Sequence, residues 1–216
     1  RTTMLSKRCI RSLSSKPAGI QRVGVVGLGL MGHGVAQMAA AAGYDVVGIE
    51  TEQKFLDAGM GRIKNSLNLV AKRNIKKGMD EAEAHKQVTD TLARITASTD
   101  LHDLKDVDLV VEAIAENKDL KLKFYSELGP IVQPNAIFAS NTSSLQITGM
   151  GDISGRAQNF VGLHFFNPVQ MMKLVEVIRT EHTDDKVFDT MLAFGQSIGK
   201  TTVSCVDTPG FIVNRL

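Results

Sequence analysis

The chain has 216 residues, of which 43% are hydrophobic and 22% are charged, and this balance is that of a globular domain rather than a disordered or fibrous chain. The longest largely apolar stretches, such as residues 109–115 with their single glutamate, are far shorter than the ~20 residues that a helix needs to cross a bilayer, so no membrane span is predicted. The formal net charge of the chain is +2, and residues 1–22 contribute six basic residues and no acid. Residues 23–216 therefore carry a net charge of −4. A negative net charge on this part of the chain gives no support to nucleic-acid binding.

The two cysteines, Cys9 and Cys205, lie near opposite ends of the chain. Two thiols so placed can build neither a disulfide framework nor a cysteine metal site. We therefore predict no metal site and expect a fold that tolerates a reducing compartment.

Residues 1–20 are predicted to be a mitochondrial transit peptide, which would place the protein in the mitochondrial matrix. The segment is rich in arginine and serine and has no acid, and a helix there would separate apolar from basic residues. The segment does not favour a secretory signal, because basic residues interrupt every apolar stretch. A disordered basic tail is the alternative. The apolar face would hold Leu5, Cys9 and Leu13, and the basic face Lys7, Arg8 and Arg11.

From residue 21 onward, short β-branched runs alternate with helical stretches, which is typical of a parallel sheet covered by helices. We expect an α/β fold, a Rossmann-type doubly wound and mainly parallel sheet with an inserted helical hairpin. The expected strands are 23–26, 45–49, 107–114, 137–140, 160–166, 174–178 and 202–206. The expected helices are 30–42, 118–128 and 184–198, with 53–73 and 80–95 forming the hairpin.

The first loop has the sequence Gly27-Leu28-Gly29-Leu30-Met31-Gly32, which fits the dinucleotide-binding pattern G-x-G-x-x-G between a strand and a helix. Gly27 permits the tight turn, Gly29 leaves room for a pyrophosphate, and Gly32 allows close packing of the helix on the strand. The helix N-terminus supplies free N–H groups for the phosphates. A tight turn in an unrelated α/β protein is the alternative interpretation.

Glu50 follows the second predicted strand, 23 residues after Gly27. A carboxylate at this place accepts hydrogen bonds from the ribose hydroxyls of NAD and repels the 2′-phosphate of NADP. No arginine follows within the next three residues. The sequence therefore favours NAD as the cofactor.

A histidine and a glutamate stand on neighbouring apolar runs of the second half. His164 lies in the run that ends at the turn Asn167-Pro168, and Glu176 lies in the run that follows. Oxidation of a secondary alcohol by hydride transfer needs a base for the hydroxyl proton, and histidine titrates nearest the working pH. A return of the chain across this turn would place Glu176 beside His164 and orient its ring. A histidine satisfied within the core is the alternative.

Four segments of the second half, taken with the glycine loop, resemble L-3-hydroxyacyl-CoA dehydrogenase, the NAD-dependent enzyme of fatty-acid β-oxidation. The resemblance extends over residues 21–216, with the segments in the family's order. They read ASNTSSL (139–145), GLHFFNPV (162–169), KLVEVI (173–178) and DTPGFIVNR (207–215).

The resemblance implies further site residues. Ser143 and Asn214 match positions that bind the substrate's 3-oxygen or order the site, and Asn141, Glu116 and Lys121 match cofactor contacts. Substrate-binding positions are matched by Ser66, Arg73, Ser143 and Asn167, although the family has a lysine at the place of Arg73. Ordinary surface roles remain the alternative for Lys121, for Arg73 with its basic neighbours, and for the polar residues beside Ser143.

The resemblance also implies a division into domains and a partner. We expect residues 21–207 to form the NAD-binding domain and residues 208–216, with a helix beginning at Pro209, to start a helical domain that makes a homodimer. The expected substrate is an acyl-CoA. Three alternatives stay open, namely a 3-hydroxybutyryl-CoA dehydrogenase, a sugar-acid dehydrogenase, and a non-catalytic NAD-binding protein of the crystallin kind.

Overall fold

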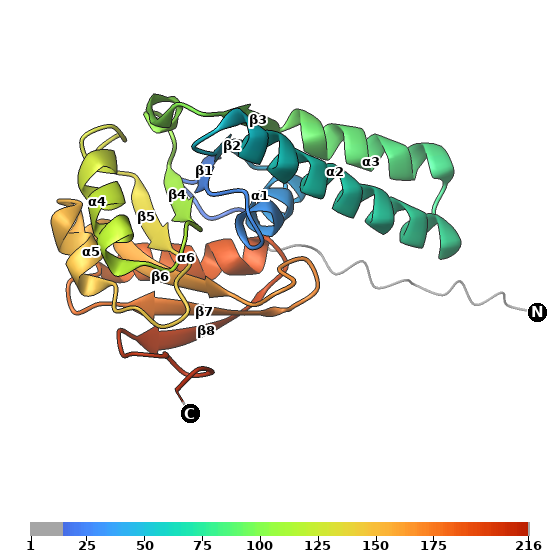
Figure 1. Ribbon diagram of the computed structural model, residues 1–216. Helices are drawn as coiled ribbons and strands as arrows, with labels where there is room; N and C mark the ends of the chain where they lie inside the picture. The colour runs from blue at the N-terminus through green and yellow to red at the C-terminus, as the bar shows by residue number, and fades with distance from the viewer. Residues whose placement is uncertain (1–14, 216) are drawn as a thin grey trace, which may run out of the picture.

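The computed structural model describes residues 15–215, which form one sheet flanked by helices (Figure 1). The predicted transit peptide lies largely outside the described residues. The strands are β1 (Arg22–Val26), β2 (Asp45–Ile49), β3 (Ile95–Ser98), β4 (Leu109–Glu112), β5 (Ile137–Ser140), β6 (Phe160–Phe165), β7 (Leu174–Arg179) and β8 (Thr201–Val206). The α-helices are α1 (Gly32–Ala41), α2 (Gln53–Lys76), α3 (Glu81–Ala93), α4 (Lys118–Leu128), α5 (Thr148–Ile153) and α6 (Asp185–Ser197), with short 3₁₀ turns at Leu101–Leu104 and Ala157–Asn159.

The eight strands lie in the order β3-β2-β1-β4-β5-β6-β7-β8. The first six are parallel in the doubly wound arrangement, β7 runs antiparallel to β6, and β8 is parallel to β7. The predicted mainly parallel Rossmann-type sheet is confirmed. The order in which the strands are added reverses at β1, because β2 and β3 lie on one side of it and β4, β5 and β6 on the other. Ligands of open α/β sheets bind at such a point, beyond the carboxyl ends of the strands.

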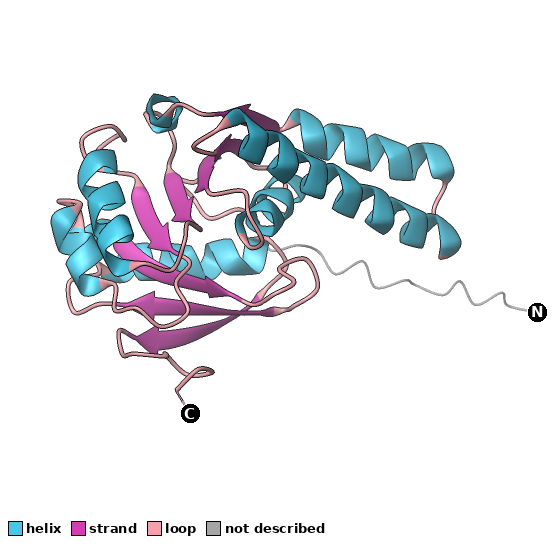
Figure 2. Cartoon of the chain, in the orientation of Figure 1, coloured by secondary structure: helices cyan, strands magenta, loops and turns pink. Residues whose placement is uncertain are grey.

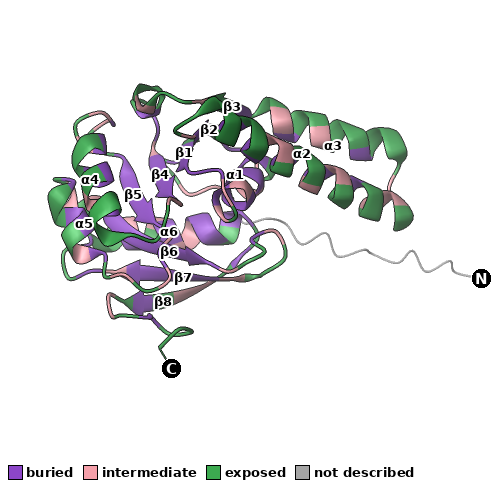
Figure 3. Cartoon of the chain, viewed as in Figure 1, coloured by how far each residue is buried: buried purple, intermediate pink, exposed green. Residues whose placement is uncertain are grey.

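The two faces of the sheet carry separate apolar cores. Helices α1 and α6 cover one face, and α4 and α5 cover the other (Figures 1 and 2). The central strands β1, β4 and β5 are buried on both faces, which explains their nearly continuous apolar sequences (Figure 3). Carboxyl-end loops that rise from such strands are therefore held on a rigid base.

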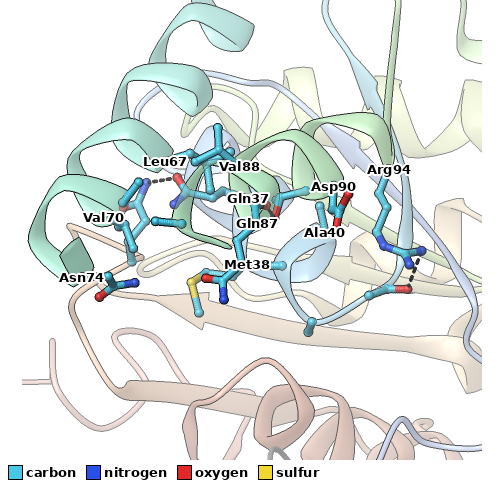
Figure 4. A pocket seen from close by; sticks show the side chains of 17 residues that line it. Gln37, Met38, Ala40, Leu67, Val70, Asn74, Gln87, Val88, Asp90 and Arg94 are labelled. Carbon is cyan, nitrogen blue, oxygen red and sulfur yellow. Dashed lines mark hydrogen bonds between the residues drawn. The ribbon is translucent and has the colours of Figure 1, made fainter. Parts of the chain in front are cut away.

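Helices α2 and α3 form the predicted hairpin, which projects from the sheet (Figure 1). Asp80 caps α3 by accepting a hydrogen bond from the Glu83 N–H. One side of the hairpin faces α1 across a groove of about 660 Å³, shown with its lining side chains in Figure 4. This groove is lined from the later turns of α1 and not from the glycine loop. No helix among residues 15–215 is long and apolar enough to cross a membrane.

Two local predictions were wrong. The second hairpin helix was expected to continue to residue 95, but α3 ends at Ala93 and residues 95–98 form the edge strand β3. A helix was expected from Pro209, but residues 209–214 form turns, because Gly210 (φ 77°) and Phe211 (φ 51°) lie in the left-handed region and cannot continue a right-handed helix.

Candidate active site

The glycine loop between β1 and α1 has the geometry that a bound pyrophosphate needs. Gly27 has φ 88°, which a residue with a side chain rarely adopts. A Cβ on Gly32 would lie 1.7 Å from the Gly27 carbonyl oxygen, whereas a Cβ on Gly29 would meet nothing within 4 Å. The loop is therefore closed on its inner side and open at Gly29. Among the other predicted loop residues, Leu30 is exposed and Met31 lines the pocket described below.

Glu50 follows β2 and reaches back to the glycine loop. Its Oε1 accepts a hydrogen bond of 2.6 Å from the Leu28 N–H. Beside it lies a cavity of about 420 Å³ with largely apolar walls, lined among others by Gly27, Glu50, Ile114 and Leu101. Such walls suit an adenine ring, and the carboxylate at the rim suits the hydroxyls of its ribose. These residues fit an NAD molecule laid across the end of β1.

A second cavity of about 330 Å³ lies on the other side of Ile114, which lines both. It gathers five predicted site residues from loops far apart in the sequence, namely Glu116, Asn141, Ser143, His164 and Asn167, together with Met31. Because Ile114 borders both cavities, a dinucleotide bound along β1 and β4 would place its second half beside His164. The structure thus brings the predicted cofactor and catalytic residues to one edge of the sheet.

His164 and Glu176 form the predicted pair. They are directly opposite in the antiparallel register of β6 and β7, and His164 Nδ1 is 2.7 Å from Glu176 Oε2. The exposed fractions are 5% for His164 and 1% for Glu176, so the pair is shielded from water. A carboxylate at Nδ1 fixes the proton on that nitrogen and leaves Nε2 as the free base.

The second oxygen of Glu176 binds the segment that follows β8. Glu176 Oε1 accepts hydrogen bonds from the N–H groups of Ile212 (3.1 Å) and Val213 (3.0 Å). The ring of Phe211, only 2% exposed, lies 5.8 Å from the His164 ring. Cys205 of β8 also neighbours Glu176, and burial together with this negative charge raises the pKa of its thiol to about 11. The Cys205 thiol therefore stays protonated beside the carboxylate.

Glu116 anchors the loop after β5, which carries Ser143. Its Oε1 accepts hydrogen bonds from Thr142 Oγ1 (2.5 Å) and from the N–H (2.8 Å) and Oγ (3.2 Å) of Ser143. Partial burial raises the pKa of Glu116, but the bonds from Thr142 and Ser143 and the nearby Lys121 charge outweigh it and lower the pKa overall. Thr142 Oγ1 also accepts from the Leu145 N–H, so Thr142 shapes the turn.

Lys121 lies behind Glu116 rather than at the cavity. Its ammonium is fully buried, 2.6 Å from Glu112 Oε1 and 3.4 Å from Glu116 Oε2. Glu112, at the end of β4, also accepts hydrogen bonds from the Ile114 N–H, Tyr125 and Ser140. Glu112 was not predictable as a site residue, because it ends an apolar run and only the tertiary structure surrounds it with donors. An ammonium enclosed in this way does not face the cavity, so we assign Lys121 to the support of Glu116.

The two predicted asparagines also join segments. Asn141 Oδ1 accepts a hydrogen bond of 2.9 Å from the Phe165 N–H, which ties the end of β5 to β6 beside His164. Asn214 Nδ2 donates to the Ser143 carbonyl oxygen at 3.1 Å. Ser143 is therefore held both by Glu116 and by the turn that follows β8.

The predicted substrate contacts Ser66 and Arg73 lie outside this cavity. Both belong to α2, seven residues apart and hence about two turns along one face. Ser66 is half-buried and Arg73 is exposed. The structure does not bring them to His164, and they are suited at most to a distant part of an extended substrate. Within residues 15–215, no cluster of histidine, cysteine and acidic side chains is arranged to hold a metal ion.

Comparison with known proteins decides the family. The family model described as "3-hydroxyacyl-CoA dehydrogenase, NAD binding domain" matches residues 22–208. The chain belongs to the 3-hydroxyacyl-CoA dehydrogenase family. Human mitochondrial hydroxyacyl-coenzyme A dehydrogenase is 44% identical over 98% of this chain and 67% of its own length. A probable 3-hydroxybutyryl-CoA dehydrogenase of Deinococcus radiodurans is 46% identical over 90% of this chain and 67% of its own.

Solved structures agree. The (S)-3-hydroxybutyryl-CoA dehydrogenase of Ralstonia eutropha superposes with a TM-score of 0.85 at 41% identity and covers 91% of this chain and 67% of that one. The matched part of the 3-hydroxyacyl-CoA dehydrogenase family is its NAD-binding domain, so the predicted cofactor is confirmed along with the predicted family and enzyme class.

Proposed function

We propose that the protein oxidises L-3-hydroxyacyl-CoA to 3-ketoacyl-CoA in fatty-acid β-oxidation, with NAD as the hydride acceptor. The observation that carries the proposal is the buried pair of His164 and Glu176, whose facing atoms are 2.7 Å apart and of which His164 lines the cavity that adjoins the glycine loop. Relatives named 3-hydroxyacyl-CoA and 3-hydroxybutyryl-CoA dehydrogenases support it. Bound NAD supplies the nicotinamide carbon that takes the hydride.

The residues of the chain divide the remaining work. His164 Nε2 takes the proton of the 3-hydroxyl during oxidation and returns it during reduction, as a positioned general base and acid. Glu176 stays ionised, fixes the tautomer of His164 and stabilises its positive charge. Ser143 is proposed to bind the 3-oxygen. Asn214 keeps Ser143 in place by donating a hydrogen bond to the Ser143 carbonyl oxygen. Asn141 and Asn167 complete the wall of the cavity.

The proposed cofactor contacts follow the two cavities. Gly29, Leu30 and Met31 present the free backbone groups at the start of α1 to the pyrophosphate. Glu50 binds the adenosine ribose, and Glu116 lies on the nicotinamide side. Ser66 and Arg73 of α2 are proposed contacts of the coenzyme A part of the substrate. The basic surface of α2 around Arg73 suits its phosphates.

The test is turnover by the complete polypeptide as the cell makes it, because this chain spans about 67% of the length of relatives such as the human enzyme. NADH oxidation is followed with acetoacetyl-CoA as the substrate. We expect turnover with NADH and loss of most of it in His164→Gln. A folded protein that binds NADH but leaves acetoacetyl-CoA and its longer homologues unreduced would contradict the proposal and favour a non-catalytic role.

Turnover of substrates with acyl chains of different length distinguishes the proposed activity from that of a 3-hydroxybutyryl-CoA dehydrogenase. Relatives are named both 3-hydroxyacyl-CoA and 3-hydroxybutyryl-CoA dehydrogenases. We expect activity on the four-carbon 3-ketoacyl-CoA and on longer 3-ketoacyl-CoA substrates. Activity confined to the four-carbon substrate would instead identify a 3-hydroxybutyryl-CoA dehydrogenase.

We also propose that the protein acts in the mitochondrial matrix. The acid-free basic segment at residues 1–20 and relatives named as mitochondrial support this location. Fusion of residues 4–19 to a fluorescent reporter should send the reporter to mitochondria. A reporter that stays in the cytosol would contradict the assignment of the leader.

The proposed domain division keeps residues 21–207 as the NAD-binding domain, and the family match over residues 22–208 supports that boundary. Residues 208–216 are proposed to lead into a helical domain that forms a homodimer in the complete polypeptide. Light scattering after size-exclusion chromatography tests the dimer, and a monomeric mass at micromolar concentration would contradict it.

A further inference from the structure

The loop between β6 and β7, residues 166–173, connects the substrate side of the site to distant elements. It carries Asn167, which lines the His164 cavity. From one side, Lys200 of the turn between α6 and β8 holds the loop. Its buried Nζ donates to the carbonyl oxygens of Val169 and Met172, the latter at 2.9 Å. The backbone of the loop is therefore fixed against the sheet.

On the opposite side the same loop packs directly on α1. A Cβ on Gly34 would lie 2.7 Å from Val169 Cβ and 3.2 Å from Gln170 Nε2, so any side chain there would displace the loop. Val169 is only 1% exposed in this contact. The first turn of α1, which begins at the glycine loop, is thus in van der Waals contact with the loop that carries Asn167.

A chain of hydrogen bonds spans this contact. Gln170 Nε2 lies 3.1 Å from His33 Nε2 and 3.3 Å from Gln37 Oε1. The other ring nitrogen of His33, Nδ1, lies 2.7 Å from the carbonyl oxygen of Gly29. Gly29 is the open position of the glycine loop, so the chain connects the pyrophosphate site to the substrate loop.

The donors and acceptors in this chain agree with one another. The Gly29 carbonyl can only accept, so His33 Nδ1 carries the proton and Nε2 presents its lone pair. The Gln170 amide has two N–H groups, and they meet the two acceptors His33 Nε2 and Gln37 Oε1. With a neutral His33 ring, each of these donors therefore meets an acceptor, and the chain of hydrogen bonds is continuous from Gly29 to Gln37.

We propose that His33 and Gln170 are positioning residues that couple the glycine loop to the Asn167 turn, so that NAD bound at the loop tightens the binding of acyl-CoA. The inference rests on the proposed function and adds an energetic link between its two binding sites. Phosphate oxygens held by the N–H groups of the loop restrict the peptide that follows Gly29. Its carbonyl then keeps His33 in place, and His33 keeps Gln170 and the loop in the arrangement that presents Asn167. By linkage, acyl-CoA tightens the binding of NAD by the same factor.

The test measures binding rather than turnover. NAD⁺ and acetoacetyl-CoA are both in the oxidised form, so they bind together without reacting. Isothermal titration calorimetry on the complete polypeptide gives the Kd of acetoacetyl-CoA with and without saturating NAD⁺. We expect NAD⁺ to lower this Kd by about fivefold or more in the wild type, the usual range of coupling between sites.

The variant Gln170→Leu keeps the size of the side chain and removes both hydrogen bonds. We expect the ratio of the two Kd values to fall to within about twofold of one, while the Kd of NAD⁺ alone changes by less than about twofold. His33→Ala removes the other half of the bridge and should give the same ratio. In the double variant the ratio of the two Kd values should be the same as in either single variant, because the two residues act as one unit.

Gln87→Leu is the matched control, because Gln87 lines the same groove from α3 (Figure 4) and its amide donates to Glu83 of its own helix. It should keep the wild-type ratio. A wild-type ratio of one, or a Gln170→Leu variant that retains the full ratio, would overturn the coupling. Failure of the wild type to bind acetoacetyl-CoA at all would overturn the proposed function and the coupling with it.

Discussion

Replacement of Glu176 by glutamine is the sharpest test of how the proposed base His164 is oriented. The reason is that the two carboxylate oxygens of Glu176 have different partners. Oε2 faces the Nδ1–H of His164, and Oε1 accepts the N–H groups of Ile212 and Val213. An amide has one acceptor oxygen and one NH₂ group, so it cannot satisfy both sides.

The two orientations of the introduced amide differ in cost. With its oxygen toward His164, the NH₂ group of the amide meets two buried N–H donors, and leaving these donors unpaired costs about 2–6 kcal/mol. With its oxygen toward Ile212 and Val213, the NH₂ group faces Nδ1, the ring must protonate at Nε2 instead, and the base is lost. The productive orientation is then populated at no more than about 3%, since 2 kcal/mol corresponds to a factor of about 30.

Loss of the negative charge adds to this effect. A hydrogen bond to a charged group contributes about 1.5–3 kcal/mol, here to the protonated His164 that forms during oxidation. Together the two effects predict that Glu176→Gln lowers kcat by at least about 10²-fold. The affinity for NADH should change by less than about twofold, because the glycine loop is untouched.

Steady-state reduction of acetoacetyl-CoA by the complete polypeptide measures kcat, and NADH fluorescence measures binding. Glu181→Gln is the matched control, since Glu181 is exposed and lies beyond the end of β7. It should leave both quantities unchanged. A folded Glu176→Gln protein with kcat within about threefold of the wild type would show that the ring of His164 does not need this carboxylate.

Four further outcomes are expected. His164→Gln should lower kcat by at least about 10²-fold with NADH binding retained, and near wild-type turnover would refute its role as the base. Fluorescence titration should show tighter binding of NADH than of NADPH, and Glu50→Ala should bring the two Kd values closer together. Equal Kd values in the wild type would refute the role given to Glu50. Lys121→Met should lower the free energy of unfolding by about 3–5 kcal/mol in urea titrations, because it leaves the buried Glu112 carboxylate without its cation; a loss below about 1 kcal/mol would contradict this. Cys205 should resist iodoacetamide in the native protein up to about pH 9, as measured by peptide mass spectrometry, and rapid native labelling at neutral pH would argue against its burial. Because folding raises the pKa of its thiol to about 11, the protonated thiol contributes to the free energy of unfolding. This contribution is fully present below about pH 9 and is lost as the pH rises toward about 11.

Local sequence signals indicated the glycine loop, and for the histidine and glutamate pair they needed the resemblance to the family to favour it over a histidine satisfied within the core. The loop follows from the spacing G-x-G-x-x-G together with its place between an apolar strand and a helix, and with Glu50 after the next strand. The pairing of His164 with Glu176 follows from two apolar runs separated by a short segment with Pro168, which favours an antiparallel return. Both features depend on residues close together in the chain.

Features that depend on distant packing were not predictable in the same way. Strand β3 has only four residues, two of them exposed, and its pairing with β2 rather than its own sequence makes it a strand. Lys121 would be exposed on an isolated helix, and it is buried only because Glu112 and Glu116 approach it from the end of β4. The bond between His33 and Gln170 joins residues 137 positions apart, so no local pattern indicates it.

The turn at residues 209–214 joins the two sides of the catalytic cavity. At one end, the N–H groups of Ile212 and Val213 bind the carboxylate that orients His164, and at the other, Asn214 binds the carbonyl of Ser143. Displacement of this turn would remove two donors from Glu176 and one from Ser143 together. A buried carboxylate that loses its donors holds its charge less well, so the base loses the group that fixes its tautomer. The order of the segment after β8 and the orientation of the proposed base His164 are therefore coupled, and we expect any contact that holds this segment in place to support the proposed proton transfer.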